Sequence, residues 1–299
     1  MDHKKRPPYT GYAILLLVVV WLILCRPWFI EGRVIPYDSK DQFYPFLYFV
    51  AESLRSGDSP FWNPYIYGGY PMVSDPQSMI FSPLALGLAL IPEHMTYGWM
   101  DFIELIHLLI GAVGILLFCR RSGWSRVAGL FGATVFLFGG SAGARLQHVP
   151  MILTYSYFPY ALLALREALE TRRLQWAIAF GAAAGVMAAH QNQVAYLLSL
   201  ALIGYAACRV LSEGWSLQNL IAQGKVLAVG GGTAMLLLAV PLYATLQFLP
   251  FSNRTGIPYE VAVANPLHPL AFLTYFVRDF FGNSWPIYYW GARAFLLLV

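Results

Sequence analysis

Charged residues are scarce in this chain. Only 11% of its 299 residues are charged, whereas soluble domains carry about 25%. Hydrophobic residues make up 58% of the chain, and the mean hydropathy is +0.57. This composition excludes an ordinary soluble domain and predicts an integral membrane protein. The formal net charge of +4 does not indicate nucleic-acid binding, because the basic residues lie between apolar runs.

Cysteine is also scarce, and a secretory cleavage site is lacking. Cys25, Cys119 and Cys208 lie far apart, in or at the ends of apolar segments, which excludes a cysteine metal motif. We interpret them as buried or lipid-facing small residues. The basic start at residues 3–6 precedes a long apolar run without an Ala-x-Ala site, so we expect a retained signal anchor.

Apolar runs long enough to cross a bilayer recur along the chain, since a spanning helix needs about 20 apolar residues. We predict seven spanning helices, at about residues 12–30, 97–118, 127–142, 152–169, 176–189, 194–208 and 226–248. An eighth helix is expected to start at Ala294 and to be cut short at Val299. The apolar stretch 79–91 is too short to span and contains Pro83, which predicts a re-entrant or interfacial segment.

The basic residues orient these spans. Lys4, Lys5 and Arg6 precede the first span, which predicts a cytoplasmic N-terminus. Counting spans from there places one set of basic residues inside: Arg120, Arg121, Arg126, Arg166, Arg172, Arg173, Arg209 and Lys225. The same count places the polar clusters outside. We therefore expect an all-α polytopic membrane protein with one transmembrane domain over 1–299, and with outer loops at 31–78 and 251–293.

The first outer loop is expected to carry an amphipathic helix at residues 41–54. Its apolar residues recur at helical spacing: Phe43, Phe46, Leu47, Val50 and Leu54. This pattern is typical of a helix lying on the membrane surface.

Two carboxylates, Asp38 and Asp41, follow the first span directly. They lie three residues apart at the start of a predicted helix, so they share one face of it. Negative charges are also stabilised near a helix N-terminus. One interpretation is that they only cap the surface helix. The other is that one is a general base whose pKa partial desolvation raises, with the second carboxylate as its partner. A third metal ligand is not evident, so we predict no cofactor, and a divalent metal is an unsupported alternative.

Aromatic rings fill the middle of the same loop. The runs Trp62-Asn63-Pro64-Tyr65 and Gly68-Gly69-Tyr70-Pro71 form a compact turn in which prolines fix φ and glycines permit positive φ. The rings either anchor the loop among lipid headgroups or stack on a sugar. In the second case Asn63 and Gln77 would hydrogen-bond to sugar hydroxyls.

Three further polar clusters are expected on the outer face. Arg145 and His148 either contact lipid headgroups or bind a phosphate in a low-dielectric site. The run His190-Gln191-Asn192-Gln193 is either a tight turn or part of a site at membrane depth. Arg254, in the last loop, either pairs with Glu260 or contributes to the same phosphate site.

The first-loop pattern resembles that of the bacterial YfhO-like membrane proteins. The resemblance is carried by Asp38-x-x-x-Gln42-x-x-Pro45, by Trp62-Asn63-Pro64-Tyr65-Ile66-x-Gly68-Gly69-x-Pro71 and by Asp75-Pro76-Gln77-x-x-x-Phe81-Ser82-Pro83-Leu84. Weaker matches follow at residues 145–148, 190–193 and 281–283. Family members are longer, with more helices, so the resemblance implies that this chain is a fragment or part of a split protein.

The resemblance implies a C-type (GT-C) glycosyltransferase core in a bacterial cell membrane. Such enzymes transfer a sugar from a polyprenyl-phosphate donor, often undecaprenyl phosphate, to teichoic acid, another envelope polymer or a glycolipid on the outer face. It also implies that Asp38 is the catalytic base and that Asp41 could substitute for it. The substrate-binding candidates are then Gln42, Trp62, Asn63, Tyr65, Asp75, Gln77, Arg145, His148, His190, Gln193 and Arg254.

Two other functions compete with glycosyl transfer. A transporter or flippase for a lipid-linked substrate would favour inverted repeats and polar residues at mid-membrane. A non-catalytic membrane fragment would need neither a base nor a sugar platform. We find no internal repeat, and the polar clusters gather at one predicted face, which favours the enzyme.

Overall fold

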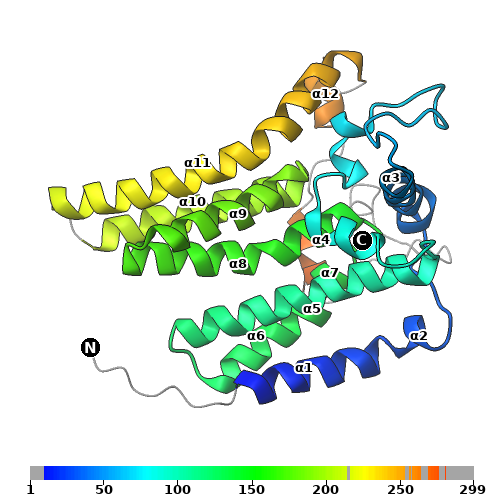
Figure 1. Cartoon of the computed structure of the whole chain (residues 1–299). Helices are drawn as coiled ribbons and strands as arrows, with labels where there is room; N and C mark the ends of the chain where they lie inside the picture. Colours follow the sequence, from blue (N-terminus) through cyan, green and yellow to red (C-terminus); the bar gives the residue numbers. More distant parts are fainter. Residues whose placement is uncertain are drawn as a thin grey trace. The chain divides into compact units, whose positions relative to one another are not determined.

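The computed structural model describes residues 10–213, 216–252, 256, 258–263, 269–275 and 280. Within these residues the chain is helical and has no strand, as predicted; one isolated antiparallel bridge joins Asn63 and Tyr70. The long helices are α1 (Thr10–Leu24), α5 (Tyr97–Arg121), α6 (Arg126–Phe138), α8 (Val149–Thr171), α9 (Leu174–Ala189), α10 (Gln193–Ser212) and α11 (Leu217–Phe248). Figure 1 shows them with the shorter helices between them.

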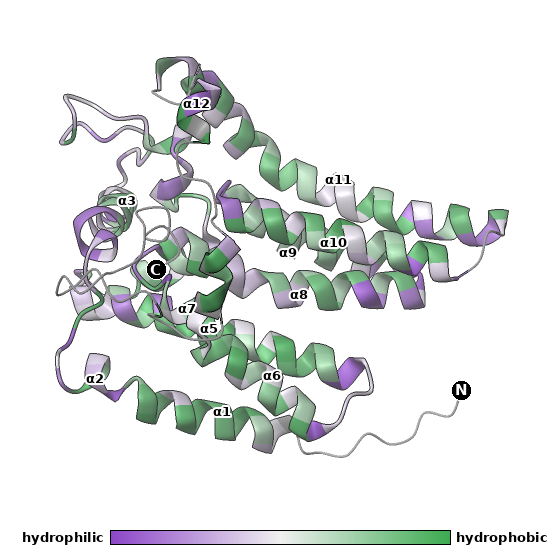
Figure 2. Cartoon of the chain, turned by 180° about the vertical axis from the view of Figure 1, so that it is seen from behind, coloured by the Kyte–Doolittle hydropathy of each residue, from purple (hydrophilic) through white to green (hydrophobic). Residues whose placement is uncertain are grey.

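Among the described residues, three helical stretches are long and apolar enough to cross a membrane. They are Tyr97–Arg121, Gln193–Ser212 and Leu217–Phe251. Shorter apolar helices occupy Gly11–Leu24, Arg126–Phe138 and Leu174–Ala189. Helix α8 has 23 residues but is less apolar. Figure 2 shows the long helices largely hydrophobic along their lengths. The structure therefore supports membrane association of an all-helical chain.

Residues 1–247 form one compact unit, and residues 248–299 form a second. In the first unit, α5 packs against α6 and α8, and α8 packs in turn against α9 and α10. Helix α1 lies beside α5 and α6, where the Trp21 indole donates a hydrogen bond to the carbonyl of Leu105 at 3.1 Å. In the second unit the described elements are η4 (Leu249–Phe251), α12 (Tyr259–Ala262) and η5 (Pro269–Tyr275).

Helices α9 and α11 approach closely because small residues meet at their crossing. A Cβ atom on Gly181 would lie 2.3 Å from the carbonyl oxygen of Gly230, and one on Gly185 would lie 3.0 Å from Leu237. Backbones can come this near only where side chains are absent, which is a common way for membrane helices to associate.

The predicted amphipathic helix is present as α3 (Tyr44–Ser56), but its apolar face does not lie open for lipid. Phe46, Leu47 and Val50 are buried, packed with the short helix α4 (Pro83–Ala89) and with the start of α5. The expectation of a surface helix is wrong for this face, because residues 72–103 supply protein contacts that the local pattern cannot reveal. Of the five apolar positions, Leu54 remains exposed, at 42%.

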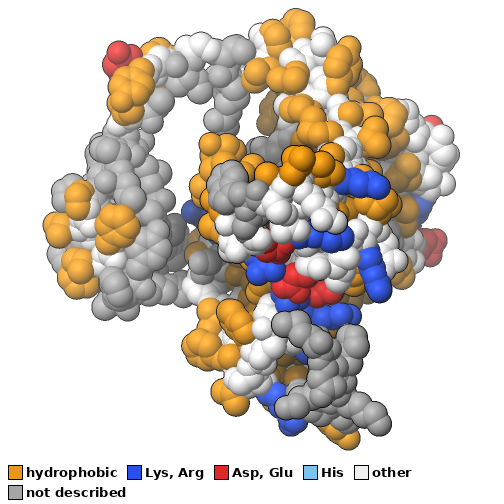
Figure 3. All heavy atoms as spheres, turned by 90° about the vertical axis from the view of Figure 1, so that its left-hand side faces the viewer, with side chains coloured by type: hydrophobic (Ala, Val, Ile, Leu, Met, Phe, Trp, Pro, Cys, Tyr) orange, Lys and Arg blue, Asp and Glu red, His pale blue; other side chains and the backbone are white. Residues whose placement is uncertain are grey.

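One end of the bundle, where α5, α8 and α10 end, carries a network of ion pairs. Its charged members are Arg121, Arg166, Glu167, Glu170, Arg172, Arg209 and Glu213, and Gln223 donates a hydrogen bond to Glu213. Figure 3 views this end and shows acidic and basic side chains gathered there. We call this set the arginine-end network. Both oxygens of Glu167, Glu170 and Glu213 have a partner, at 3.5 Å or less.

Candidate functional site

The opposite end of the bundle holds the first loop, which is tied to α5 by two acidic side chains. Ser39 donates a hydrogen bond to Glu104, and Lys40 forms an ion pair with Asp101. The second oxygen of Asp101 accepts the backbone N–H of Ile35 at 3.2 Å. Asp101 and Glu104 are fully buried. The start of the first loop is thus held onto the first half of α5.

The backbone at this point is unusual in two ways. Tyr37 lies in the left-handed region, at φ 61°, and directly precedes Asp38. Residues Ser39–Phe43 then form a π-turn, η1, in which the N–H of Tyr44 bonds to the carbonyl of Ser39. Pro45 has no N–H to donate to the turn before it, which favours this wider turn. Strained backbone of this kind is often found at functional sites.

Asp38 is brought to His148, 110 positions later in the chain. The carboxylate Oδ2 lies 3.7 Å from His148 Nε2, and the two side chains are 50% and 24% exposed. Desolvation, followed by the charge of Arg145, lowers the pKa of His148 below 6.5, while Asp38 acts in the opposite direction. His148 is therefore mainly neutral at pH 7. Its Nδ1 is buried and has no partner among the described residues.

A second layer of polar groups lies deeper, on α5. Glu104 and His107 are three residues apart, so they share a face of the helix. His107 Nδ1 contacts the carbonyl of Ile103 at 2.6 Å; when the ring is neutral and Nδ1 donates, Nε2 keeps its lone pair. Both Nε2 of His107 and Oε2 of Glu104 are buried without a partner among the described residues.

Aromatic and histidine rings continue this layer toward α9. The ring of Tyr157 lies 6.2 Å from that of His107 and 6.4 Å from that of His190. Ser82 Oγ lies 2.5 Å from His190 Nε2, which ties the start of α4 to the end of α9. Burial lowers the pKa of His190 to about 4, so it too is neutral. We call the whole set the loop-end cluster: Asp38, Ser39, Lys40, Ser82, Asp101, Glu104, His107, His148, Tyr157 and His190.

The remaining first-loop candidates form a separate group around the turn at residues 61–78. Gln42 donates a hydrogen bond to Gln77. Asp75 accepts the Tyr70 hydroxyl and the backbone N–H of Gln77, each at 2.8 Å. Burial raises the pKa of Asp75, and these two hydrogen bonds act against that rise. No contact described for this group reaches Asp38 or His148.

Asn63 has a structural part in that turn. It is 4% exposed, its side-chain oxygen accepts the N–H of Tyr65 at 2.9 Å, and its backbone pairs with Tyr70. The rings around it differ, since Trp62 is 56% exposed and Tyr65 is 85% exposed. Trp62 covers Gly69, where an added Cβ would lie 2.3 Å from the indole. The rings are accessible, whereas the amide is committed to the turn.

The last candidates are dispersed. Asp41 and Arg145 are exposed, one in η1 and the other just before α8. Gln193 is exposed at the first position of α10, and its neighbour Asn192 caps that helix by accepting the N–H of Ala195 at 2.9 Å. Arg254 lies outside the described residues. The structure thus brings Asp38 and His148 together, and it links His190 to His107 through the ring of Tyr157.

The sequence interpretation missed Asp101, Glu104 and His107, because they lie inside an apolar run that was read only as a span. Their spacing of three residues was an available signal, since ionisable residues inside a spanning helix often mark function. No group of three or more potential ligands placed to hold a metal ion is found in the described part of the chain. Comparison with protein-family models, curated proteins and solved structures found no match in any of the three.

Proposed function

We propose that this chain is a polytopic, seven-span membrane glycosyltransferase acting on the outer face of a bacterial cell membrane. It would transfer a sugar from a polyprenyl-phosphate donor to a hydroxyl of an envelope polymer or glycolipid. The observation that carries the proposal is the position of Asp38. Its half-exposed carboxylate is held 3.7 Å from a neutral histidine, above buried polar atoms that have no described partner.

Asp38 serves as the general base in this mechanism. It takes the proton of the acceptor hydroxyl, whose oxygen forms a bond to the anomeric carbon of the donor sugar. The bond from that carbon to the phosphate oxygen breaks, and its electron pair leaves with the polyprenyl phosphate. A single displacement of this kind inverts the anomeric configuration. Arg145, three residues before His148, stabilises the charge on the leaving phosphate.

The deeper layer would receive the donor sugar. Oε2 of Glu104 and Nε2 of His107 accept hydrogen bonds from hydroxyl groups, and burial strengthens such bonds. Glu104 also holds Ser39, next to Asp38, so that it positions the base. The prenyl chain of the donor would lie beside α5 and residues 79–91. The exposed rings of Trp62 and Tyr65 offer faces for the acceptor.

The test is Asp38→Asn in membranes of cells expressing the chain. Undecaprenyl-phosphate glucose, radiolabelled in the sugar, is supplied as donor, with galactose and N-acetylglucosamine versions as parallel probes. Loss of the base is expected to slow transfer to the envelope fraction by about 10² to 10⁴-fold.

Asp41→Asn is the matched control. It removes a carboxylate three residues away that is exposed, and transfer is expected to stay within about twofold of wild type. Full transfer by Asp38→Asn would refute the proposed base. Full transfer by Asp38→Asn with loss in Asp41→Asn would reassign the base to Asp41.

The buried side chains of α5 favour one second candidate, a transporter or flippase for a lipid-linked sugar. Asp101, Glu104 and His107 are buried in a helix that is long and apolar enough to span a membrane, and transporters commonly keep polar groups in such helices. Vesicles containing the purified protein distinguish the two. Movement of the donor between leaflets without transfer to an acceptor would favour the transporter.

A further inference from the structure

The turn at residues 61–78, which we call the aromatic turn, presents exposed aromatic rings. The exposed fraction is 53% for Phe61, 56% for Trp62, 85% for Tyr65 and 89% for Tyr67. Single exposed rings are common on protein surfaces, whereas several on one short turn indicate a contact surface. The aromatic turn is thus a candidate binding surface outside the loop-end cluster.

Three of these rings are held in place by contacts within the protein. The contacts are Tyr65 with Phe49 of α3, at 6.2 Å between ring centroids, Tyr67 with Tyr70, at 5.8 Å, and the Trp62 indole over Gly69. The backbone beneath them is fixed by the antiparallel pairing of Asn63 with Tyr70. Side chains that are ordered before binding lose little conformational freedom in a complex, so the aromatic turn is preorganised for a ligand.

The chemistry of the rings matches a sugar. The face of an aromatic ring carries partial negative charge, which attracts the C–H groups on one side of a pyranose ring. The hydroxyls of Tyr65 and Tyr67 and the indole N–H of Trp62 are hydrogen-bonding groups at the edges of those faces. A sugar has the complementary arrangement, with C–H groups on its faces and hydroxyls around its edge.

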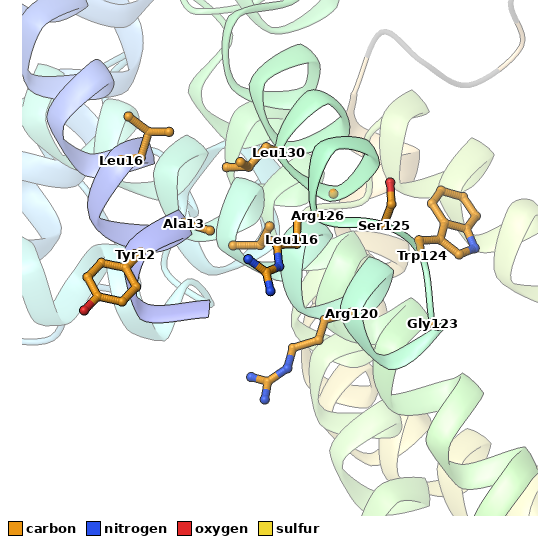
Figure 4. A pocket seen from close by; sticks show the side chains of 11 residues that line it. Tyr12, Ala13, Leu16, Leu116, Arg120, Gly123, Trp124, Ser125, Arg126 and Leu130 are labelled. Carbon is orange, nitrogen blue, oxygen red and sulfur yellow. The ribbon is translucent and has the colours of Figure 1, made fainter. Parts of the chain in front are cut away.

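The charge of the aromatic turn excludes a good fit to a polyanion. Residues 56–93 contain no Lys, Arg or His, and Asp58, three positions before Phe61, is exposed. Basic side chains lie at the arginine end instead, where Figure 4 shows Arg120 and Arg126 in the lining of a pocket of about 360 Å³. A polymer of phosphate groups would therefore meet a carboxylate at the aromatic turn, and like charges disfavour binding.

A bilayer surface fits the aromatic turn less well than a sugar does. The aliphatic side chains of the turn, Ile66, Met72 and Val73, are buried or partly buried, so they do not extend toward acyl chains. The apolar face of the neighbouring helix α3 is also covered by protein. Anionic membrane surfaces attract basic segments, which this turn is not.

We propose that the aromatic turn binds an uncharged glycan chain. The inference rests on the proposed function and narrows its acceptor to a neutral polysaccharide or a glycolipid with an uncharged glycan, in place of a phosphate polymer such as teichoic acid. Tyr65 and Tyr67 stack on the sugar rings. Gln42, in the π-turn that follows Asp38, is hydrogen-bonded to Gln77, so the glycan surface is tied to the segment that carries the proposed base.

The experiment is saturation-transfer NMR of the full chain in a neutral detergent, with maltohexaose, cellohexaose and poly(glycerol phosphate) as probes. At least one neutral glycan is expected to bind, and more tightly than the phosphate polymer. Tyr65→Ala/Tyr67→Asn should weaken that binding by about tenfold, because two stacking faces are lost. Asparagine is chosen because it tolerates the left-handed backbone at Tyr67, where φ is 52°.

Three control variants separate the ring faces from other effects. Tyr12→Ala/Tyr196→Ala removes two exposed rings, from α1 and α10, and should change glycan binding less than about twofold. Tyr65→Phe/Tyr67→Phe keeps both faces and should stay within about threefold of wild type. Asp58→Lys should tighten binding of the phosphate polymer several-fold and leave the neutral glycan within about twofold.

Failure of both neutral glycans to bind, or tighter binding of poly(glycerol phosphate) to the unaltered chain, would overturn the proposal. So would glycan binding that disappears in lipid nanodiscs, because the rings would then lie in the bilayer. These measurements need no sugar donor. A protein that binds glycan through Tyr65 and Tyr67 but transfers no sugar would therefore refute glycosyl transfer and support the glycan surface.

Discussion

The two ends of the helical bundle differ in whether their buried polar side chains have partners. At the arginine end, each oxygen of Glu167, Glu170 and Glu213 meets a basic side chain. The unpartnered buried atoms described there belong to arginine side chains and to Gln223. At the loop end, a carboxylate oxygen of Glu104 and ring nitrogens of His107 and His148 are buried without a described partner.

This difference predicts different roles for the two ends. Buried polar groups without partners cost folding free energy, and chains usually satisfy them. The arginine end does so for its carboxylates by ion pairs among α5, α8 and α10. The loop end leaves a carboxylate oxygen of Glu104 and Nε2 of His107 buried without such a partner, in the cluster that also holds the half-exposed carboxylate of Asp38. Matched substitutions at the two ends test this interpretation.

The largest effect is expected from Glu167→Gln at the arginine end. Glu167 is 5% exposed and pairs with Arg166 and Arg121; after the change Arg166 keeps Glu170, whereas Arg121 loses the carboxylate with which it is described. The free energy of unfolding in detergent should fall by about 3 kcal/mol. Glu31→Gln breaks the exposed pairs with Arg26 and Arg33 and should cost at most about 1 kcal/mol. Equal losses in the two variants would contradict the assignment of stability to the network.

A smaller and opposite effect is expected from Glu104→Gln at the loop end. The amide can still accept the Ser39 hydrogen bond, and a buried carboxyl with an unpartnered oxygen is removed. The free energy of unfolding should be unchanged, or rise by about 1 kcal/mol. Sugar transfer should fall, because the side chain that would hold the donor sugar and position Asp38 is altered. A loss of stability as large as that of Glu167→Gln would erase the difference between the two ends.

The smallest effect concerns pH. Because the pKa of His148 is lowered in the folded state, its contribution to stability is present above pH 6.5 and is lost as the pH falls through the lowered value. His148→Gln should therefore remove part of the acid-induced loss of stability below pH 6.5. Melting temperatures of both proteins between pH 4.5 and 8 measure this; parallel curves would show that His148 does not contribute.

Local patterns were enough to predict the helical fold and the common location of Asp38 and His148 in the candidate site. Hydropathy located the long helices, and loop position placed Asp38 and His148 on one face before their 3.7 Å contact was known. The burial of the apolar face of α3 was not predictable, because it depends on residues 72–103 folding over it. Likewise, the choice of Lys40 as partner of Asp101 follows from how η1 packs on α5, which no spacing in either segment encodes.

The aromatic turn at residues 61–78 shows a second limit of prediction from sequence. The sequence does not distinguish an Asn63 that binds a sugar from one that caps a turn. The structure does, because the N–H of Tyr65 donates a hydrogen bond to the side-chain oxygen of Asn63 at 2.9 Å. The prolines and glycines did predict the turn itself, because proline fixes φ and glycine permits positive φ.

The π-turn at Ser39–Phe43 makes this region unusually sensitive to chain length. A turn of this width accommodates one residue more than an α-helix does. Deleting a single residue from it would let α3 run on as regular helix, with its own apolar face undisturbed. The residues before the deletion would rotate by about 100° relative to α3. Ser39 and Lys40 would then face away from Asp101 and Glu104, so that one lost codon would separate the proposed base from its support while the helix stayed intact.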